Sequence, residues 1–320
     1  MIDRSRLASL RAAEEDRFAD LHPRSADLAE QARGPLLAGV PMPWMTRWPG
    51  RFPVFFESAS GARLTDVDGT EYVDLCLGDT GAMTGHALPQ VTSALAERAS
   101  RGITTMLPSA DAVWVGEELA RRFGLPTWQL AMSATDANRF VLRFARHLTG
   151  RPRVAVMDWC YHGTVDETLA VLDDGRVVAR PGALGPQVPV AETTAVIPFN
   201  DADALDRRLA HGDVACLLME PALTNIGIVL PDPGYLEAVR EITRRRDVLL
   251  VIDETHTLCA GPGGATAAWG LDPDLLVVGK PIGGGVPCAA YGMTAEVADR
   301  LSGPMLGHEI DVAGVGGTLT

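Results

Sequence analysis

One lysine, Lys280, stands among 27 arginines in this sequence. Arginine keeps its proton in proteins, whereas a lysine amine can lose its proton and become a nucleophile. Lys280 follows the apolar segment 274–279 and precedes the turn Pro281-Ile-Gly-Gly-Gly285. An amine at the end of a buried strand, beside flexible glycines, is partly desolvated and still accessible, which favours the neutral form that attacks an aldehyde. The alternative is a surface lysine that was retained by chance. The position at a strand end favours a role as a nucleophile over this alternative.

An acidic residue, Asp253, follows the apolar run 248–252 and lies 27 residues before Lys280. A carboxylate at such a strand end can keep the nitrogen of a pyridine ring protonated, so that the ring accepts electrons from a substrate carbanion. An acidic residue there is also a common N-cap of the next helix. Because the only lysine of the chain lies nearby in the sequence, we favour the interpretation in which Asp253 pairs with a ring nitrogen.

The segment Ser133-Ala-Thr-Asp-Ala-Asn138 lies where a predicted strand, 127–132, meets a predicted helix. Small residues and a threonine at a helix N-terminus offer backbone N–H groups and the positive end of the helix dipole to a phosphate. The same residues also fit an ordinary N-capping motif. The segment alone leaves both interpretations open.

Two further segments place polar or aromatic groups after predicted strands. The motif Tyr161-His162-Gly163 follows a run that ends at Met157, and an aromatic ring there can stack on a flat cofactor. Glu220 follows the run 214–219, and Asn225 comes five residues later. In a parallel sheet, ligands gather beyond the carboxyl ends of the strands, so we expect these groups near Lys280.

The elements that position these residues are apolar runs alternating with helical patterns. Apolar runs without alternation indicate strands buried on both faces, and helices between them indicate a mostly parallel sheet. The runs are 153–157, 194–197, 214–219, 248–252 and 275–278. The predicted helices are 88–101, 110–123, 135–149, 164–172, 201–210 and 232–246. The sequence therefore predicts an α/β domain over roughly 75–300.

The first 75 residues have a different pattern. Segment 1–33 is rich in Arg, Asp and Glu and predicts one or two amphipathic surface helices. A Pro- and Trp-rich loop over 40–50 precedes short alternating runs at 54–57, 62–67 and 71–75, which predict a small antiparallel β unit. We expect an N-terminal segment over 1–75 and a large domain over 76–320.

Composition excludes several classes of partner. The net charge of −13 opposes binding to nucleic acid or to an anionic membrane, and no apolar run is long enough to span a bilayer. The N-terminus lacks the apolar core of a signal peptide, so we expect a cytoplasmic protein. Neither the seven histidines nor the five cysteines have metal-ligand spacing, so we expect no metal site.

Read in order, the motifs Ser-x-Thr-acid-Ala, Tyr-His-Gly, Glu-Pro, Asp-Glu and Gly-Lys-x-x-Gly-Gly-Gly closely resemble those of the class III aminotransferases. This family includes glutamate-1-semialdehyde aminomutase, ω-transaminases and β-amino-acid transaminases. The resemblance covers nearly the whole chain. It implies pyridoxal 5′-phosphate (PLP) as cofactor and a fold type I large domain with a seven-stranded sheet between helices.

The resemblance also implies a role for each matching residue. Lys280 would form the internal aldimine with PLP and then move a proton as acid and base. Asp253 would pair with the pyridine nitrogen, and Tyr161 would stack on the ring. The other implied cofactor contacts are Ser133, Ala134, Thr135, His162, Glu220, Asn225 and His256. Thr318 would reach the phosphate of the neighbouring subunit, which implies a homodimer with a shared active site.

The sequence departs from the family pattern at several places. Ala134 and Asp136 stand where the phosphate motif usually has glycine and glutamate. Aminomutase-like relatives grip the substrate carboxylate with an arginine of the N-terminal loop, where this chain has Trp44, with Arg47 three residues later. We take Trp44 and Arg47 as candidate substrate residues. The chain ends at Thr320, before the small C-terminal domain of the family, so we expect that domain to be absent.

Three functions are compatible with these features. The first is an aminotransferase that moves an amino group between an amine or amino acid and a keto acid or aldehyde by a ping-pong mechanism. The second is a 2,1-aminomutase acting on a glutamate-1-semialdehyde-type substrate, which needs no external keto acid. The third is a truncated, non-catalytic protein with the same fold.

Overall fold

The computed structural model describes residues 3–307 and 314–315. The chain divides into two compact units. The first unit comprises Met1–Leu77 and Thr84–Ser93, and the second comprises Gly78–Met83 and Ala94–Thr320.

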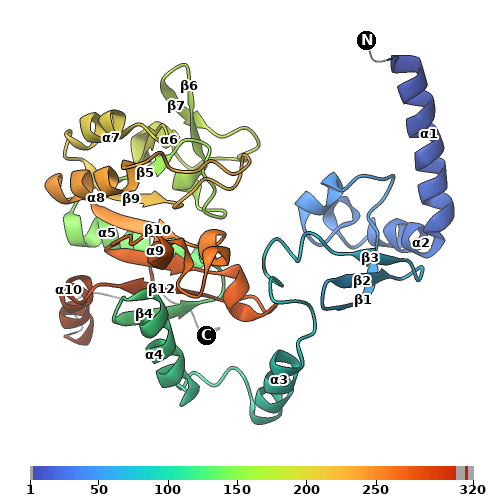
Figure 1. Ribbon diagram of the computed structural model, residues 1–320, viewed down its shortest axis with the longest axis horizontal. Helices are drawn as coiled ribbons and strands as arrows, with labels where there is room; N and C mark the ends of the chain where they lie inside the picture. The colour runs from blue at the N-terminus through green and yellow to red at the C-terminus, as the bar shows by residue number, and fades with distance from the viewer. Residues whose placement is uncertain (1–2, 308–313, 316–320) are drawn as a thin grey trace. The chain divides into compact units, whose positions relative to one another are not determined.

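The first unit contains two helices and a small sheet (Figure 1). The helices are α1 (Arg4–Leu21) and α2 (Pro23–Ala32), and the antiparallel strands are β1 (Phe56–Ser60), β2 (Arg63–Asp66) and β3 (Glu71–Val73). The predicted N-terminal helices and antiparallel unit are confirmed, although only α2 has buried residues. Asp66 is buried at the β2–β3 turn, where its carboxylate accepts a hydrogen bond from the Thr70 N–H at 2.8 Å.

The second unit is built on a seven-stranded sheet of order β4-β12-β11-β10-β9-β5-β8. Its strands are β4 (Thr127–Ala131), β5 (Arg153–Met157), β8 (Thr194–Ile197), β9 (Val214–Met219), β10 (Leu249–Asp253), β11 (Leu275–Val278) and β12 (Ala289–Met293). Strand β12 pairs antiparallel with both of its neighbours, and the other pairs are parallel. The prediction of a mostly parallel seven-stranded sheet is therefore confirmed.

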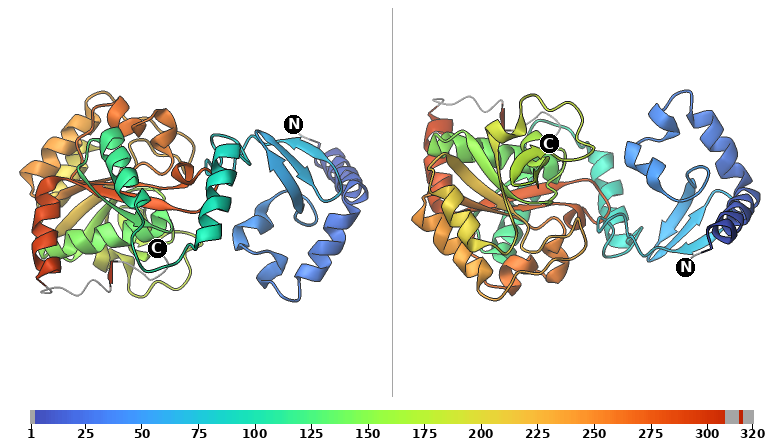
Figure 2. Two further views of the ribbon diagram at one scale, coloured as in Figure 1. Left: turned by 90° about the horizontal axis from the view of Figure 1, so that it is seen from below. Right: turned by 90° about the horizontal axis from the view of Figure 1, so that it is seen from above.

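Helices cover both faces of this sheet, as the views in Figures 1 and 2 show. The helices along the chain from Pro89 onward are α3 (Pro89–Arg101), α4 (Asp111–Phe123), α5 (Ala134–Thr149), α6 (Val190–Thr193), α7 (Ala202–Leu209), α8 (Tyr235–Arg245), α9 (Gly264–Ala268) and α10 (Ala295–Leu306). Every residue of β8, β9, β11 and β12 is buried. Burial on both faces explains why these strands have no polar alternation.

Two expectations from the sequence differ from the structure. The helix predicted over 164–172 is wrong, because this stretch holds a short 3-10 turn followed by β6 (Ala170–Asp173), which pairs antiparallel with β7 (Arg176–Ala179). The turn between them is Asp174-Gly175, with φ of 46° and 72°, which is the tight-hairpin signal that the helical interpretation overlooked. Strand β12 was not predicted, since its Ala and Gly residues have low β propensity.

Among the described residues, no helix is both long enough and apolar enough to cross a membrane.

Candidate active site

The candidate site lies at the carboxyl edge of the large sheet. Strand β4 runs parallel to β11, because each pairs antiparallel with β12. The carboxyl ends of β4, β11, β10, β9 and β5 therefore share one edge, which is where open α/β sheets bind ligands. Directly at or after these ends come Ser133, Lys280, Asp253, Glu220 and Tyr161.

Asp253 is a buried carboxylate held by three donors. Its Oδ2 accepts hydrogen bonds from Asn138 Nδ2 and His162 Nδ1, both at 2.9 Å, and its Oδ1 accepts one from the Thr255 N–H at 3.0 Å. Burial opposes ionisation, but the hydrogen bond and charge of His162, with the other donors, hold the pKa of Asp253 below its ordinary value of 3.8. The site therefore contains a permanent negative charge at the end of β10.

His162 is the positive partner of this carboxylate. It is buried and lies in the loop after β5. Burial alone would lower its pKa, but the neighbouring Cys160 and Asp253 side chains raise the pKa of His162 well above 6.5. The two residues form a buried ion pair. Asp253 ends β10, so it lies at the same carboxyl edge of the sheet as Lys280, which follows β11.

This ion pair makes the stability of the fold depend on pH. The raised pKa of His162 contributes stability that is complete below 6.5 and is lost as pH rises through the folded value. The lowered pKa of Asp253 contributes stability above 3.8 that is lost in acid. We expect His162→Gln to cost about 1.5–3 kcal/mol of unfolding free energy near pH 5 and less at alkaline pH, once the imidazole loses its proton. Urea unfolding of the unmodified protein and of His162→Gln across this pH range measures the loss of unfolding free energy. A loss that grows with pH would contradict the ion pair.

Lys280 follows β11 with its backbone in the left-handed region, at φ 44°. A residue other than glycine there costs of order 1–3 kcal/mol, and such strain is concentrated at functional sites. The Lys280 amine lies 2.7 Å from His256 Nε2 and forms an ion pair with the carboxylate of Asp79. About 28% of the Lys280 side chain is exposed. The Lys280 amine is thus fixed by two side-chain contacts and still accessible to solvent.

His256 has a neutral imidazole at ordinary pH. Burial and the positive charge of Lys280 hold its pKa below 6.5, although the charges of Asp79, Glu220 and Asp253 partly oppose them. Two of these groups contact the ring: the Lys280 amine lies 2.7 Å and an Asp79 carboxylate oxygen 4.0 Å from His256 Nε2. A neutral imidazole in contact with an ammonium group accepts a hydrogen bond from it and fixes its direction.

The first turn of α5 forms another side of the site. Ser133 caps the helix, since its Oγ accepts a hydrogen bond from the Asp136 N–H at 3.2 Å. Thr135 Oγ1 accepts one from the Thr164 N–H at 3.2 Å, which ties the helix to the Tyr-His-Gly loop. The first N–H groups of a helix have no partners within the helix, so those of Ala134 and Thr135 are available to an anion. Capping and anion binding are compatible here.

Two glycines allow close approach of the chain around α5. A Cβ on Gly279 would lie 2.8 Å from the Cβ of Ala134, and one on Gly163 would lie 1.9 Å from Thr135 Oγ1. Real Cβ atoms do not come this close, so both positions require glycine. They bring Lys280 and His162, their chain neighbours, next to the helix N-terminus.

We expect Gly163→Ala to destabilise the fold by about 2–4 kcal/mol, because a clash adds to the strain of a left-handed alanine. The matched control is Gly175→Ala, whose φ of 72° is similar but whose added Cβ has no atom within 4 Å. The control should cost only about 1–2 kcal/mol. Thermal or urea unfolding measures both, and equal costs would show that the contact with Thr135 is unimportant.

Glu220 and Tyr161 complete the edge. Glu220 is buried, and its carboxylate accepts hydrogen bonds from the Tyr161 N–H at 3.3 Å and the Thr224 hydroxyl at 2.5 Å. The guanidinium of Arg180 lies 5.5 Å from the ring centre of Trp159 and 6.0 Å from that of Tyr161. Tyr161 as a residue is still 39% exposed, so it is accessible to a molecule that stacks on it.

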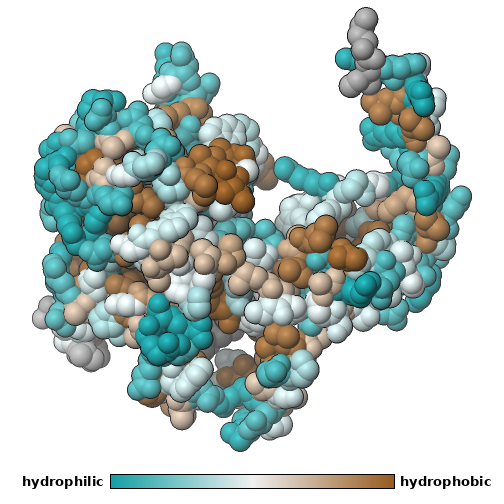
Figure 3. Space-filling model, viewed as in Figure 1, coloured by the Kyte–Doolittle hydropathy of each residue, from teal (hydrophilic) through white to brown (hydrophobic). Residues whose placement is uncertain are grey.

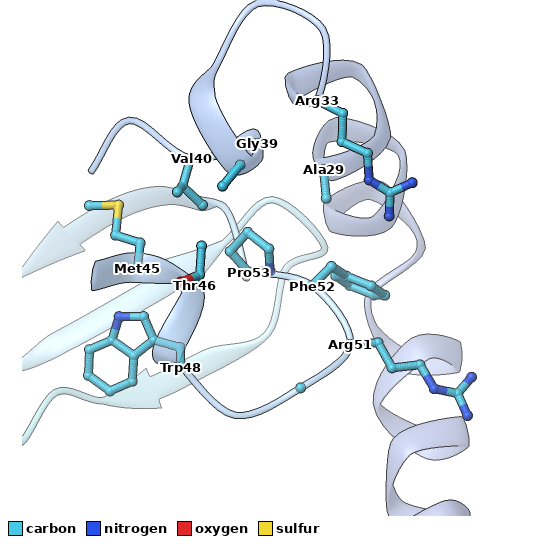
Figure 4. A pocket seen from close by; sticks show the side chains of 12 residues that line it. Ala29, Arg33, Gly39, Val40, Met45, Thr46, Trp48, Arg51, Phe52 and Pro53 are labelled. Atoms are coloured by element: carbon cyan, nitrogen blue, oxygen red, sulfur yellow. The ribbon is translucent and has the colours of Figure 1, made fainter. Parts of the chain in front are cut away.

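Four further candidates from the sequence lie in other segments of the chain. Asn225 is exposed in the loop after β9, where its backbone bridges to Gly227. Trp44 and Arg47 are exposed in the first unit, in a 3-10 turn beside a cavity of about 180 Å³ that Met45, Trp48 and Arg51 help to line (Figure 4). Thr318 lies outside the described residues. The roles of these four residues remain predictions.

Three residues of the site were not singled out from the sequence. Asn138 and Thr255 hold Asp253, and Asp79 meets Lys280 from 201 residues away in the chain. The sequence offers a weak indication for Asn138, because it is a polar residue on the apolar face of a predicted helix. Asp79 had none, because only the folded chain brings it to β11.

An α/β sheet with a lone lysine, a buried acid and a helix N-terminus at one edge defines an enzyme of fold type I. The comparisons with known proteins identify the family. A family model described as "Aminotransferase class-III" matches residues 44–310. The chain belongs to this family, whose members are PLP-dependent enzymes.

The relatives include both aminomutases and transaminases. The chain is 36% identical over 307 residues to a glutamate-1-semialdehyde 2,1-aminomutase of Myxococcus xanthus, covering 91% of this chain and 71% of that protein. It matches the crystal structure of a glutamate-1-semialdehyde-aminomutase from Pseudomonas aeruginosa with a TM-score of 0.95 and 51% identity, covering 99% of this chain and 71% of the other. A lysine-to-alanine variant of that enzyme was solved in complex with PMP. An ω-transaminase from Sphaerobacter thermophilus matches at 32% identity and a TM-score of 0.79, covering 86% of this chain and 64% of the other.

Proposed function

We propose that this protein binds PLP through Lys280 and transfers an amino group between an amine or amino acid and a keto acid or aldehyde, in two half-reactions. The observation that carries the proposal is the geometry of Lys280. Its amine follows β11, lies 2.7 Å from a neutral His256 and is one strand away from the buried carboxylate of Asp253. This arrangement supplies a nucleophile, a hydrogen-bond acceptor that orients it and a fixed negative charge at one sheet edge.

The residues present fit PLP. Asp253 offers a buried carboxylate of lowered pKa to a protonated ring nitrogen. Beside it, the buried Asn138 Oδ1, His162 Nε2 and Thr255 Oγ1 have no hydrogen-bond partner among the described residues, as expected of a site shaped for another polar molecule. The N-terminus of α5 suits a phosphate group.

Each side chain then has a physical task. When bound, PLP supplies an electron sink for the substrate carbanion. Asp253 keeps a proton on the ring nitrogen by its charge, and Tyr161 covers one face of the ring and excludes water. Lys280 holds the cofactor, and its freed amine takes and returns a proton on the substrate carbon. The neutral ring of His256 accepts a hydrogen bond from the Lys280 amine at 2.7 Å and orients it.

We also propose a homodimer. Several large apolar side chains around α4 and β4 are exposed, among them Trp114, Leu130 and Met132. They border a cavity of about 800 Å³ in the second unit, and apolar patches are visible on the surface in Figure 3. Exposed apolar surface of this extent favours association. Sedimentation of the purified protein tests the proposal, and location in the cytoplasm remains a prediction.

The second candidate function is a 2,1-aminomutase, favoured by the names of the relatives at 36% and 51% identity. The requirement for a keto acid separates the two functions. For a transaminase, we expect amino donors to be consumed in many turnovers only when a keto acid or aldehyde acceptor is added. Conversion of glutamate-1-semialdehyde to its amino isomer without any acceptor would favour the mutase and contradict the transaminase proposal.

A further inference from the structure

Asp79 contacts the amine on which the proposed chemistry depends. Its carboxylate forms an ion pair with the Lys280 amine and lies 4.0 Å from His256 Nε2. About 68% of the Asp79 side chain is exposed, against 28% for Lys280. The carboxylate therefore stands on the solvent side of the amine, where an incoming molecule meets it first.

The backbone fixes Asp79 in this position. Four successive residues, Leu77 to Thr80, have positive φ values between 49° and 71°, and three of them are not glycine. Such a run persists only where surrounding contacts hold it. The Lys280 ion pair is one such contact, and it pulls the pKa of Asp79 below 3.8 despite the opposing effect of partial burial.

During the proposed reaction, the Lys280 amine cannot remain the ion-pair partner of Asp79 throughout. If Lys280 held PLP, an amino donor would have to take the place of the Lys280 amine, so the nitrogens of the donor and of Lys280 would meet in the same small space. A Lys280 amine engaged in holding the cofactor would no longer be the ammonium group that pairs with Asp79. The carboxylate is then free to meet the ammonium group of the donor.

We propose that Asp79 is a specificity-determining residue, whose carboxylate receives the ammonium group of the amino donor and disfavours donors with a carboxylate next to the amine. This inference rests on the proposed function. A donor without that negative charge gains the ion pair, whereas an α-amino acid also brings a like charge close to Asp79. The preferred donors are therefore amines or amino compounds whose acid group is distant or neutral.

Glycine and glycinamide test this proposal, because they differ in the charge beside the amine and are small enough to fit any donor site. Each is added at increasing concentration to the protein carrying PLP, and borohydride then fixes the cofactor to whichever amine holds it. Mass mapping gives the concentration of each probe that halves the label on Lys280. The ratio of the two concentrations is compared between the unmodified protein and Asp79→Asn, with Asp79→Glu as the control that keeps the charge. The basicity of each probe does not depend on which variant is used. A change in the ratio between variants therefore reports the effect of the Asp79 side chain on donor preference.

We expect the preference for glycinamide to fall by about tenfold in Asp79→Asn and to persist in Asp79→Glu. An unchanged ratio in Asp79→Asn, with Lys280 still labelled, would overturn this inference and leave the proposed function standing. Absence of label on Lys280 in the unmodified protein would overturn both.

Discussion

Lys280→Ala is expected to abolish covalent attachment of PLP and to lower the rate of amino transfer by at least about 10³-fold. The reason is that Lys280 is the only lysine in the chain, and its amine is the group that meets His256 and Asp79 at the sheet edge. No neighbouring amine can replace it as nucleophile or as proton carrier. The measurements are the absorbance of bound cofactor and the initial rate with an amine and a keto acid.

The matched control is Lys280→Arg, which keeps the positive charge beside Asp79 but cannot act as a neutral nucleophile. We expect this variant to fold as stably as the unmodified protein and to be as inactive as the alanine variant. If Lys280→Arg retained more than a small part of the activity, positive charge rather than nucleophilicity would be what the reaction needs at this strand end, and the proposed role of Lys280 would be wrong.

The second large effect is expected for Asp253→Asn, which should lower the rate of amino transfer by about 10²–10³-fold. The amide has nearly the same shape and can still accept a hydrogen bond from His162, but it has no charge to keep a ring nitrogen protonated. The variant should bind PLP more weakly and still allow label on Lys280. The rate at saturating cofactor separates the loss of chemistry from the loss of affinity.

Asp274→Asn is the matched control for this variant. Asp274 precedes β11, at the opposite edge of the sheet from Asp253, and pairs with Arg240 at 2.8 and 2.9 Å. We expect it to lower stability and to leave the rate per folded molecule unchanged. Equal losses of rate in the two variants would mean that Asp253 acts by supporting the fold and has no direct part in the chemistry.

The strands that hold the site could be predicted from sequence because burial on both faces leaves a strong signal. The runs 153–157, 194–197, 214–219 and 275–278 coincide with β5, β8, β9 and β11. Residues directly after such runs have little freedom, since the strand end fixes their position. This is why Lys280, Asp253 and Glu220 could be expected at a common edge.

Other parts of the site depend on contacts that no local pattern reports. Asp79 lies in a loop of left-handed residues, within the short segment Gly78–Met83 of the second unit, and contacts Lys280 across 201 residues of sequence. Asn225 was expected near the cofactor from its distance after Glu220; it is exposed in the loop after β9, and its role stays a prediction. Spacing along a loop does not fix direction in the way that spacing after a strand does.

The most direct test of the central claim is borohydride reduction of the purified protein with PLP, followed by peptide mass mapping. The chain has one lysine, so the only other primary amine is the α-amino group at its N-terminus. We expect a pyridoxyl group on the peptide that contains Lys280, and its loss in Lys280→Arg. Label confined to the N-terminal amine, or no label at all, would contradict the assignment of Lys280 as the residue that holds the cofactor.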